Sequence, residues 1–473
     1  MASPGSSSSS SRSGRRVEDA PAVGLDPLVY LPPDMLDNVL ARLPFEQLVR
    51  TSGLSRGWRR RWESVAGLDI WFSPGVSPKP SIGALKRCAA PVLSFTARVL
   101  PPHFHCADGW LRALRGKRVA KLAVELFDPR ARFLGDVDGA SLPAIFLHRE
   151  LVHLDLAGCC SIPQVPRGFG GFPNLVTLSL NHVRLPFFGG GAHLQYLISS
   201  APNLAELSLI DVDQEERRSQ VVRCDIRAPK LRVLKLVMLN DNDNGCEVAE
   251  DLPMLEEAVI SADCLLETDE FVTTFQRIAT VNKLTFRTDS RKCNQDPLRV
   301  ISWKFQNLKV ATLSANFGKL SSIMSIFSLL RCAPYIEKLE IEVEKTYIQA
   351  DEDDENFDPE TYDDEVYDFL SHLDMVVDEI DEQLLNEKAS DDLFVSLKHV
   401  SLHGIKGYMR NDICFMKFLL SKTGSLESFD VTLRSEFRKE TACVELATCS
   451  RASPQAKISV RLLNKPTPEP DES

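Results

Sequence analysis

Three side chains near the end of the chain, His399, Ser401 and His403, have types that could perform acid–base or nucleophilic chemistry. They alternate along one predicted strand, so all three face the same side of it. A histidine beside a serine suggests an activated nucleophile. Such a site also needs an acid to orient the base, oxyanion donors and a sharp turn that presents the nucleophile. The neighbouring sequence offers none of these, and we predict a binding surface without catalytic activity.

A second cluster, His103, His105 and Cys106, carries side chains that could bind zinc. A zinc site needs further ligands at suitable spacing, and none follows in the sequence. The twelve cysteines are scattered, and only Cys159 and Cys160 are adjacent. This distribution is typical of reduced thiols and not of a disulfide framework. We therefore expect no metal and no cofactor.

A recurring six-residue phrase determines which side of the strand His399, Ser401 and His403 face. The phrase consists of a leucine, two residues, an apolar residue, one residue and another apolar residue. The phrase begins, with some degenerate copies, at Leu151, Leu175, Leu204, Leu231, Leu255, Val281, Leu308, Ile336, Leu397 and Leu426. The intervals are 24, 29, 27, 24, 26, 27, 28, 61 and 29 residues. A period of this size indicates a leucine-rich-repeat array, in which stacked units bury a face that no single unit can bury alone.

The expected fold class is α/β, a solenoid of parallel strands and short helices. Between phrases, apolar residues recur at helical spacing, as in Ile323, Phe327 and Leu330. The predicted array spans residues 85–345, an acidic insertion spans 346–392, and terminal repeats span 393–465. Alternation places a row of polar residues on the exposed strand face. Candidate substrate-binding residues on this row are Lys235, Lys283, Arg287, His399 and His403.

Residues 31–65 predict a separate helical head. Pro32 and Pro33 suit a helix start, and Leu36, Leu40 and Leu43 follow at helical spacing before Pro44 ends the run. A second short helix contains Leu48, and a third is predicted from Leu54, Trp58 and Trp62 at intervals of four. Three short helices cannot bury this many large apolar side chains, so the head needs either the array or another protein as a cover.

The head sequence resembles an F-box over residues 28–72. The matching positions are Leu31, Pro32, Leu36, Leu40, Leu43, Pro44, Leu48, Thr51, Ser52, Leu54, Ser55 and Trp58. Gly57 departs from the arginine common in the pattern, and glycine inside a helix weakens it by about 1 kcal/mol relative to alanine. The resemblance implies docking on a Skp-type adaptor and, through it, on a cullin scaffold. The implied adaptor-binding residues are Leu31, Pro32, Leu36, Leu40, Leu43, Pro44, Leu48, Leu54 and Trp58.

A second resemblance covers residues 397–431, which are similar to the FBD region of plant F-box/leucine-rich-repeat proteins. The likeness rests on Leu397, Val400, Leu402, Gly404, Gly407, Phe415, Leu419, Leu420 and Leu426. The order of head, repeats and FBD-like end implies a non-catalytic subunit that recruits an unknown protein substrate to a ubiquitin ligase. The alternative is a repeat scaffold or ligand-binding protein that does not promote degradation.

The distribution of charge indicates which classes of partner the chain could bind. Residues 351–392 hold 19 acidic residues and one lysine, so the net charge of −11 comes from this insertion, which is either a solvated loop or an acidic surface for a basic partner. Residues 366–377 could form an amphipathic helix within it. The one dense basic cluster, Arg56 with Arg59 to Arg61, lies on the head without interleaved aromatic residues, so we predict no nucleic-acid partner.

The two ends of the chain are predicted to be disordered tails, residues 1–24 and 466–473. The first contains the serine run 6–11 followed by Arg12, Arg15 and Arg16. This composition is compatible with a plain tail, a nuclear signal or a transit peptide. No apolar run approaches the ~18 residues of a membrane span. We expect the protein in the nucleus, the cytoplasm or both.

Overall fold

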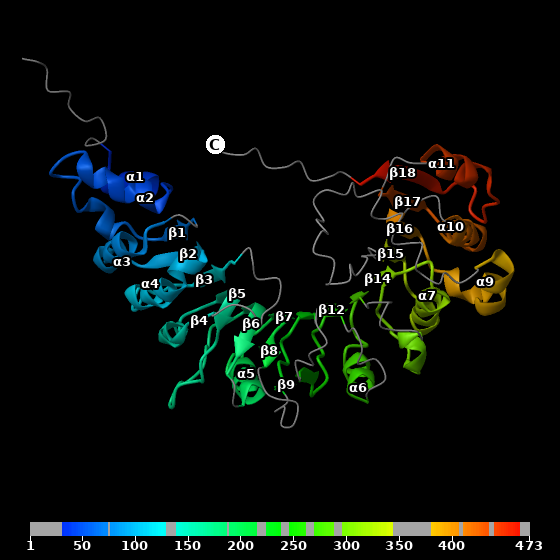
Figure 1. Cartoon of the computed structure of the whole chain (residues 1–473), viewed down its shortest axis with the longest axis horizontal. Helices are drawn as coiled ribbons and strands as arrows, with labels where there is room; N and C mark the ends of the chain where they lie inside the picture. The colour runs from blue at the N-terminus through cyan, green and yellow to red at the C-terminus, as the bar shows by residue number, and fades with distance from the viewer. Residues whose placement is uncertain are drawn as a thin grey trace, which may run out of the picture.

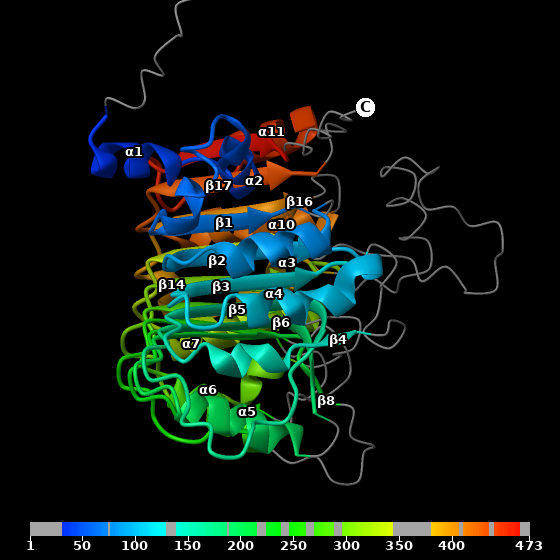
Figure 2. The same ribbon diagram turned by 90° about the vertical axis from the view of Figure 1, so that its left-hand side faces the viewer.

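The computed structural model describes residues 31–73, 76–128, 139–186, 189–214, 224–237, 246–261, 269–287, 296–343, 380–405, 410–434 and 439–463. Within these residues, parallel strands stack side by side into one long sheet. The sheet lines the inner side of an arch, and helices cover its outer side (Figure 1). Viewed from the end of the arch, the strands lie one above another with their arrows in the same direction (Figure 2). This is the predicted leucine-rich-repeat solenoid.

The main path of the sheet contains β1 (Leu68–Phe72), β2 (Val92–Val99), β3 (Lys121–Leu126), β5 (His153–Ser161), β6 (Thr177–Leu185), β7 (Glu206–Ile210), β10 (Val233–Val237), β12 (Glu257–Ser261), β13 (Lys283–Arg287), β14 (Val310–Ala315), β15 (Lys338–Val343), β16 (His399–Ile405), β17 (Ser428–Leu433) and β18 (Lys457–Leu462). Two short strands, β4 (Ala140–Ser141) and β8 (Asp213–Gln214), extend it beside β5 and β6. The outer helices are α3 (Pro78–Arg87), α4 (Ala107–Ala113), α5 (Gly190–Ser199), α6 (Asp269–Arg277), α7 (Leu320–Cys332), α9 (Glu382–Lys388), α10 (Arg410–Lys422) and α11 (Lys439–Thr448).

The outer layer also contains short 3₁₀ helices. They are η4 (Pro101–Cys106), η6 (Pro143–Leu147), η7 (Pro297–Val300) and η8 (Asp391–Phe394). None of the helices in the described residues combines the length and the apolar character that a membrane crossing requires.

The first residue of every predicted phrase is buried, from Leu151 to Leu426. Side chains that follow it at alternate positions of the strand, such as Leu154 and Leu156, are buried as well. Residues between them, such as Asp155, face the inner side of the arch. The phrase therefore specifies which face of each strand turns toward the helices.

The array begins earlier than residue 85. Three further strands, β1 to β3, precede the first recognised phrase, and each follows the same spacing with valine in place of the leading leucine. These valines, Val65, Val92 and Val119, are buried. A search that accepted any apolar residue at the first position would have found these three repeats.

The acidic insertion leaves the stacking of the repeats intact. β15 and β16 pair directly, with Lys338 opposite His399 and Ile341 opposite Leu402, although 61 residues separate their phrases. Residues 380–392, assigned by sequence to the insertion, belong to the outer layer: they include α9, and Ile380 and Leu385 are buried. The predicted loop at 351–365 and the predicted helix at 366–377 lie outside the described residues, as do the two tails.

The head consists of α1 (Pro33–Leu40), α2 (Phe45–Arg50) and two 3₁₀ turns, η2 (Thr51–Gly53) and η3 (Arg61–Ser64). The predicted third α-helix is absent from residues 51–64. Gly53 and Gly57 favour turns in this segment because glycine is a poor helix former. Leu54 consequently points outward, while Trp58 and Trp62 are buried. The head ends before residue 72, since β1 is already part of the sheet.

Aromatic rings join the head to the first repeats. Phe45 of α2 packs edge-on against Trp62, with ring centroids 6.0 Å apart, and contacts Phe72 of β1 at 5.9 Å. Phe72 in turn packs against Phe95 at 5.4 Å and Trp110 at 5.3 Å. The head and the array therefore share one hydrophobic core.

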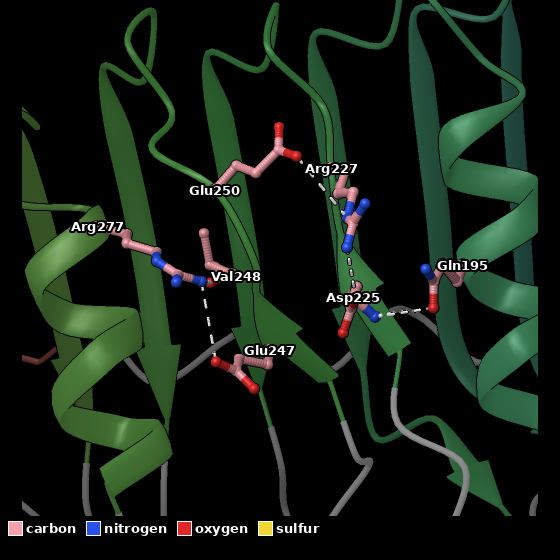
Figure 3. Close-up of polar contacts among 7 residues, drawn as sticks. All are labelled: Gln195, Asp225, Arg227, Glu247, Val248, Glu250 and Arg277. Carbon is pink, nitrogen blue, oxygen red and sulfur yellow. Dashed lines mark hydrogen bonds and ion pairs between the residues drawn. The ribbon is translucent and has the colours of Figure 1, made fainter.

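Between α5 and α6, the outer layer contains two short parallel strands, β9 (Cys224–Ile226) and β11 (Cys246–Val248). Polar contacts link these strands to the flanking helices (Figure 3). The Asp225 N–H donates to Gln195 of α5 at 3.3 Å, and Arg277 of α6 lies 3.8 Å from Glu247. Arg227 bridges Asp225 and Glu250. Four consecutive repeats are thus connected on the outer side.

The direct pairing of β15 with β16 predicts that the insertion can be shortened without loss of the fold. Deleting residues 351–365 should change the thermal midpoint only slightly, because the lost segment lies between two strands that already pair. Thermal unfolding followed by circular dichroism measures the effect.

Deleting residues 380–394 provides a control of equal length. This segment contributes the buried Ile380, Leu385 and Phe394, so its loss should lower the midpoint clearly. Equal destabilisation by the two deletions would contradict the assignment.

Candidate functional site

The head exposes three large apolar side chains, Met35, Val39 and Leu54. These side chains are 60%, 50% and 66% exposed. Met35 and Val39 lie one turn apart on α1, about 100° around the helix from Leu36 and Leu40, which are buried. An 8-residue helix with apolar residues on two sides has one side left for a partner. We call Met35, Val39 and Leu54 the head surface.

Local sequence explains how α1 presents this surface. Pro33 occupies the first helical turn, and Asp34 complements the positive end of the helix dipole. Arg61 donates a 2.9 Å hydrogen bond to Asp37 and a further one to the Pro33 carbonyl, which ties the later turn to α1. Pro44 precedes α2 and sets its direction. The orientation of α1 is therefore fixed from both sides.

The structure divides the nine predicted adaptor-binding residues into three groups. Leu36, Leu40, Leu48 and Trp58 are buried and maintain the head. Leu31 and Leu43 are half-buried, and Pro32, Pro44 and Leu54 are exposed. Met35 and Val39 were absent from the predicted set. The helical spacing of Val39 from Met35 was the available signal, but it does not say which apolar side of the helix faces outward.

A basic group adjoins the head surface. Arg56 and Arg59 are exposed, while Arg60 lies 3.5 Å from Glu63 and Arg61 pairs with Asp37. These residues lie on turns and not on the predicted third helix. Their arrangement adds positive charge at the edge of the apolar surface.

The five predicted substrate-binding residues all lie on the inner face of the sheet, on three strands. Lys283 and Arg287 are on β13, His399 and His403 on β16, and Lys235 on β10. Lys283 pairs with Glu257 at 3.0 Å. Arg287 makes two hydrogen bonds to Glu342, at 3.0 and 3.1 Å. These two cations are therefore partly neutralised by carboxylates of their own chain.

The histidine face contains acids that the sequence did not reveal as neighbours. Ser401 lies in register between Glu340 of β15 and Asp430 of β17. Neither histidine is hydrogen-bonded to Ser401: His399 Nδ1 lies 3.1 Å from the Ser428 hydroxyl and its Nε2 lies 3.9 Å from Glu427, while His403 Nδ1 lies 3.4 Å from the Thr432 hydroxyl. The geometry is that of a hydrogen-bonded strand surface.

No group of three histidine, cysteine or acidic side chains in the described residues could hold a metal ion. His103, His105 and Cys106 lie on or beside the turn η4, on the outer side of the array. Burial raises the pKa of the Cys106 thiol, with nearby Lys79 acting in the opposite direction. Burial also raises the pKa of Cys160 to about 12, which keeps that thiol protonated near neutral pH.

Comparison with known proteins gives two matches to family models. Residues 28–67 match the F-box domain, and residues 107–341 match the family described as "FBD-associated F-box protein At5g56370, LRR repeats". The first match ends just before β1, in agreement with the structural end of the head.

Two relatives from Arabidopsis thaliana are similar to this chain over two thirds or more of its length. FBD-associated F-box protein At5g38590 is 25% identical over 354 residues, covering 68% of this chain and 80% of the relative. F-box/FBD/LRR-repeat protein At1g13570 is 24% identical over 463 residues, covering 90% and 96%. In this chain, the predicted FBD-like end at 393–465 contains β16 to β18 and continues the sheet.

Among solved structures, the LRR ectodomain of the membrane receptor kinase GASSHO1/SCHENGEN3 from Arabidopsis thaliana aligns with 84% of this chain and 38% of its own length. The identity is 10% and the TM-score 0.29, a likeness too low to carry an argument. The strand register alone establishes the solenoid.

Glu340 on the inner face gives a prediction on acid stability. Burial alone would raise its pKa, but hydrogen bonds from Lys338 and Thr312, the latter at 2.9 Å, outweigh burial and lower it. The carboxylate therefore stabilises the fold above the unfolded pKa of about 4.3, and this contribution is lost as pH falls through the lower folded value. In Glu340→Gln, thermal stability should decline less between pH 7 and pH 3.

The thermal midpoints of the two proteins should converge toward the acid end of this range, as Glu340 takes up a proton and comes to resemble glutamine in shape. This convergence serves as the control. Parallel declines over the whole range would contradict the role of Glu340.

Proposed function

Because the chain belongs to the plant F-box proteins with leucine-rich repeats, we propose that it is the substrate-recruiting subunit of an SCF-type ubiquitin ligase. In this role the head binds a Skp-type adaptor, the adaptor links it to a cullin scaffold, and the array holds a protein substrate. The chain contributes no chemical step. It raises the local concentration of a substrate lysine near the ubiquitin-charged enzyme.

The observation that carries this proposal is the head surface. Met35, Val39 and Leu54 are large apolar side chains exposed within a folded domain whose other large apolar residues are mostly buried. Exposed apolar groups of this kind mark protein interaction sites. The adjacent Arg56 and Arg59 favour a partner with acidic groups beside its apolar contact.

The inner face of the array is a separate surface, formed by a different part of the chain. It carries many polar side chains and is rigid, because each strand is hydrogen-bonded to its neighbours. A rigid surface loses little conformational entropy when a partner binds. The two surfaces therefore suit two partners that bind together.

The proposal predicts that Met35→Asp with Val39→Asp abolishes adaptor binding, because two charges would enter an apolar contact. Both side chains are exposed, so the head should remain folded. Co-purification of the full chain with a plant Skp-type adaptor, followed by size-exclusion chromatography, measures the loss, and thermal unfolding verifies the fold.

Met254→Asp with Val444→Asp is a matched control, since these residues are also more than half exposed but lie on the array. It should bind the adaptor as the unmodified chain does. Full adaptor binding by the head variant would refute the proposed function. Adaptor binding without ubiquitin transfer in a reconstituted ligase would instead favour a scaffold that does not promote degradation.

A further inference from the structure

Lys235 occupies an unusual environment at the middle of the inner face. Along its own strand, β10, its neighbours on the same side are Val233 and Val237. Across the sheet it lies in register with Ser208 of β7 and Val259 of β12. Ile210 of β7 lies in register with Val237. Four branched aliphatic side chains thus flank the base of the Lys235 side chain, at Cβ spacings of about 5 to 8 Å.

Three other cations on this face, on β13 and β15, are matched with anions. Lys283 pairs with Glu257, Arg287 with Glu342, and Lys338 with Glu340 at 2.6 Å. Lys235 is exposed, and within the described residues it forms no ion pair and no side-chain hydrogen bond. Its charge is therefore available to an external anion.

The nearest acids on the adjoining strands already have partners. Glu257 binds Lys283, and Glu206 accepts a 3.3 Å hydrogen bond from the Thr177 hydroxyl. Both lie level with Val233, one strand to either side. Their negative charge limits how many additional carboxylates this region tolerates. A single carboxylate at Lys235 fits, whereas a run of acidic residues would meet repulsion.

We propose that Lys235, Ile210, Val233, Val237 and Val259, together the Lys235 island, form the docking site for an extended segment of a substrate protein. One aspartate or glutamate of that segment binds the Lys235 ammonium. Aliphatic side chains on either side of the acid pack on the valines and the isoleucine. The identification of the partner as a ubiquitination substrate rests on the proposed function, but the docking chemistry rests on this face alone.

A polypeptide fits this site better than a small organic acid. The island lies on β7, β10 and β12, which are neighbours in the sheet on the inner side of the arch (Figure 1). Its aliphatic side chains are half-buried. Small ligands generally need a concave site that buries most of their surface. A peptide can instead cross several strands and combine contacts that are individually weak.

The test is selection of a random peptide display library on the immobilised full chain, without adaptor. The enriched peptides should share one acidic residue flanked by aliphatic residues. Lys235→Met should weaken their binding about tenfold or more, because the charge-assisted contact is lost. Lys235→Glu should shift the enrichment to peptides with lysine or arginine at the same position.

Lys121→Met is the matched control, an exposed lysine on β3 of the same sheet, and it should bind the selected peptides as the unmodified chain does. Enrichment that ignores both Lys235 substitutions would overturn the inference. Displacement of the peptides by free isovalerate at comparable concentrations would reassign the site to small organic acids. Displacement by polyglutamate would show that nonspecific charge drives binding.

These outcomes can be separated from those of the proposed function. The selection measures the Lys235 island alone, while adaptor binding measures the head surface. A chain that binds the adaptor but selects no acidic peptide would retain the proposed function and lose this inference.

Discussion

The stacking of the repeats depends on one recurring backbone interaction. A carbonyl just before each strand of the main path from β3 to β16 accepts two N–H groups from the start of the next strand: Val152 accepts from Val176 and Thr177, and Val176 accepts from Ala205 and Glu206. The same pattern continues across the insertion, where Glu337 accepts from Lys398 and His399. It fixes neighbouring strands at about 4.8 Å, whereas packed helices need about 8 to 10 Å. The helical side must be longer than the strand side, and the sheet bends into an arch.

The same difference in width explains the outer layer at the middle of the arch. There β9 and β11 replace helices between α5 and α6, and strands need less width than helices. Their edges are held by side-chain contacts such as Arg277 with Glu247 and Gln195 with Asp225. Inner and outer surfaces thus have different tasks. The outer surface maintains the spacing between neighbouring repeats, and the inner surface is available to bind a partner.

The repeat fold was predictable because its determinant is local and recurs. A buried leucine at a fixed distance before two alternating apolar residues identifies each strand, and Leu397 obeys the rule despite the long interval before it. Exposure of particular side chains was not predictable in this way. Leu36 and Met35 are both apolar residues of α1, and only the tertiary packing of α1 decides that Leu36 is buried and Met35 exposed. Likewise, Arg287 reaches Glu342 across β14, over the small side chain of Ser314, a contact set by strand order.

The aromatic contacts from Trp62 through Phe45 to Phe72 make the head the N-terminal cap of the solenoid. The head and the array are consequently one continuous structural unit and not two modules joined by a hinge. In a ligase, such a junction would fix the orientation of the inner face relative to the cullin and so define a zone in which substrate lysines can be reached. Selection among lysines would then depend on where a substrate lies along the arch as well as on how tightly it binds.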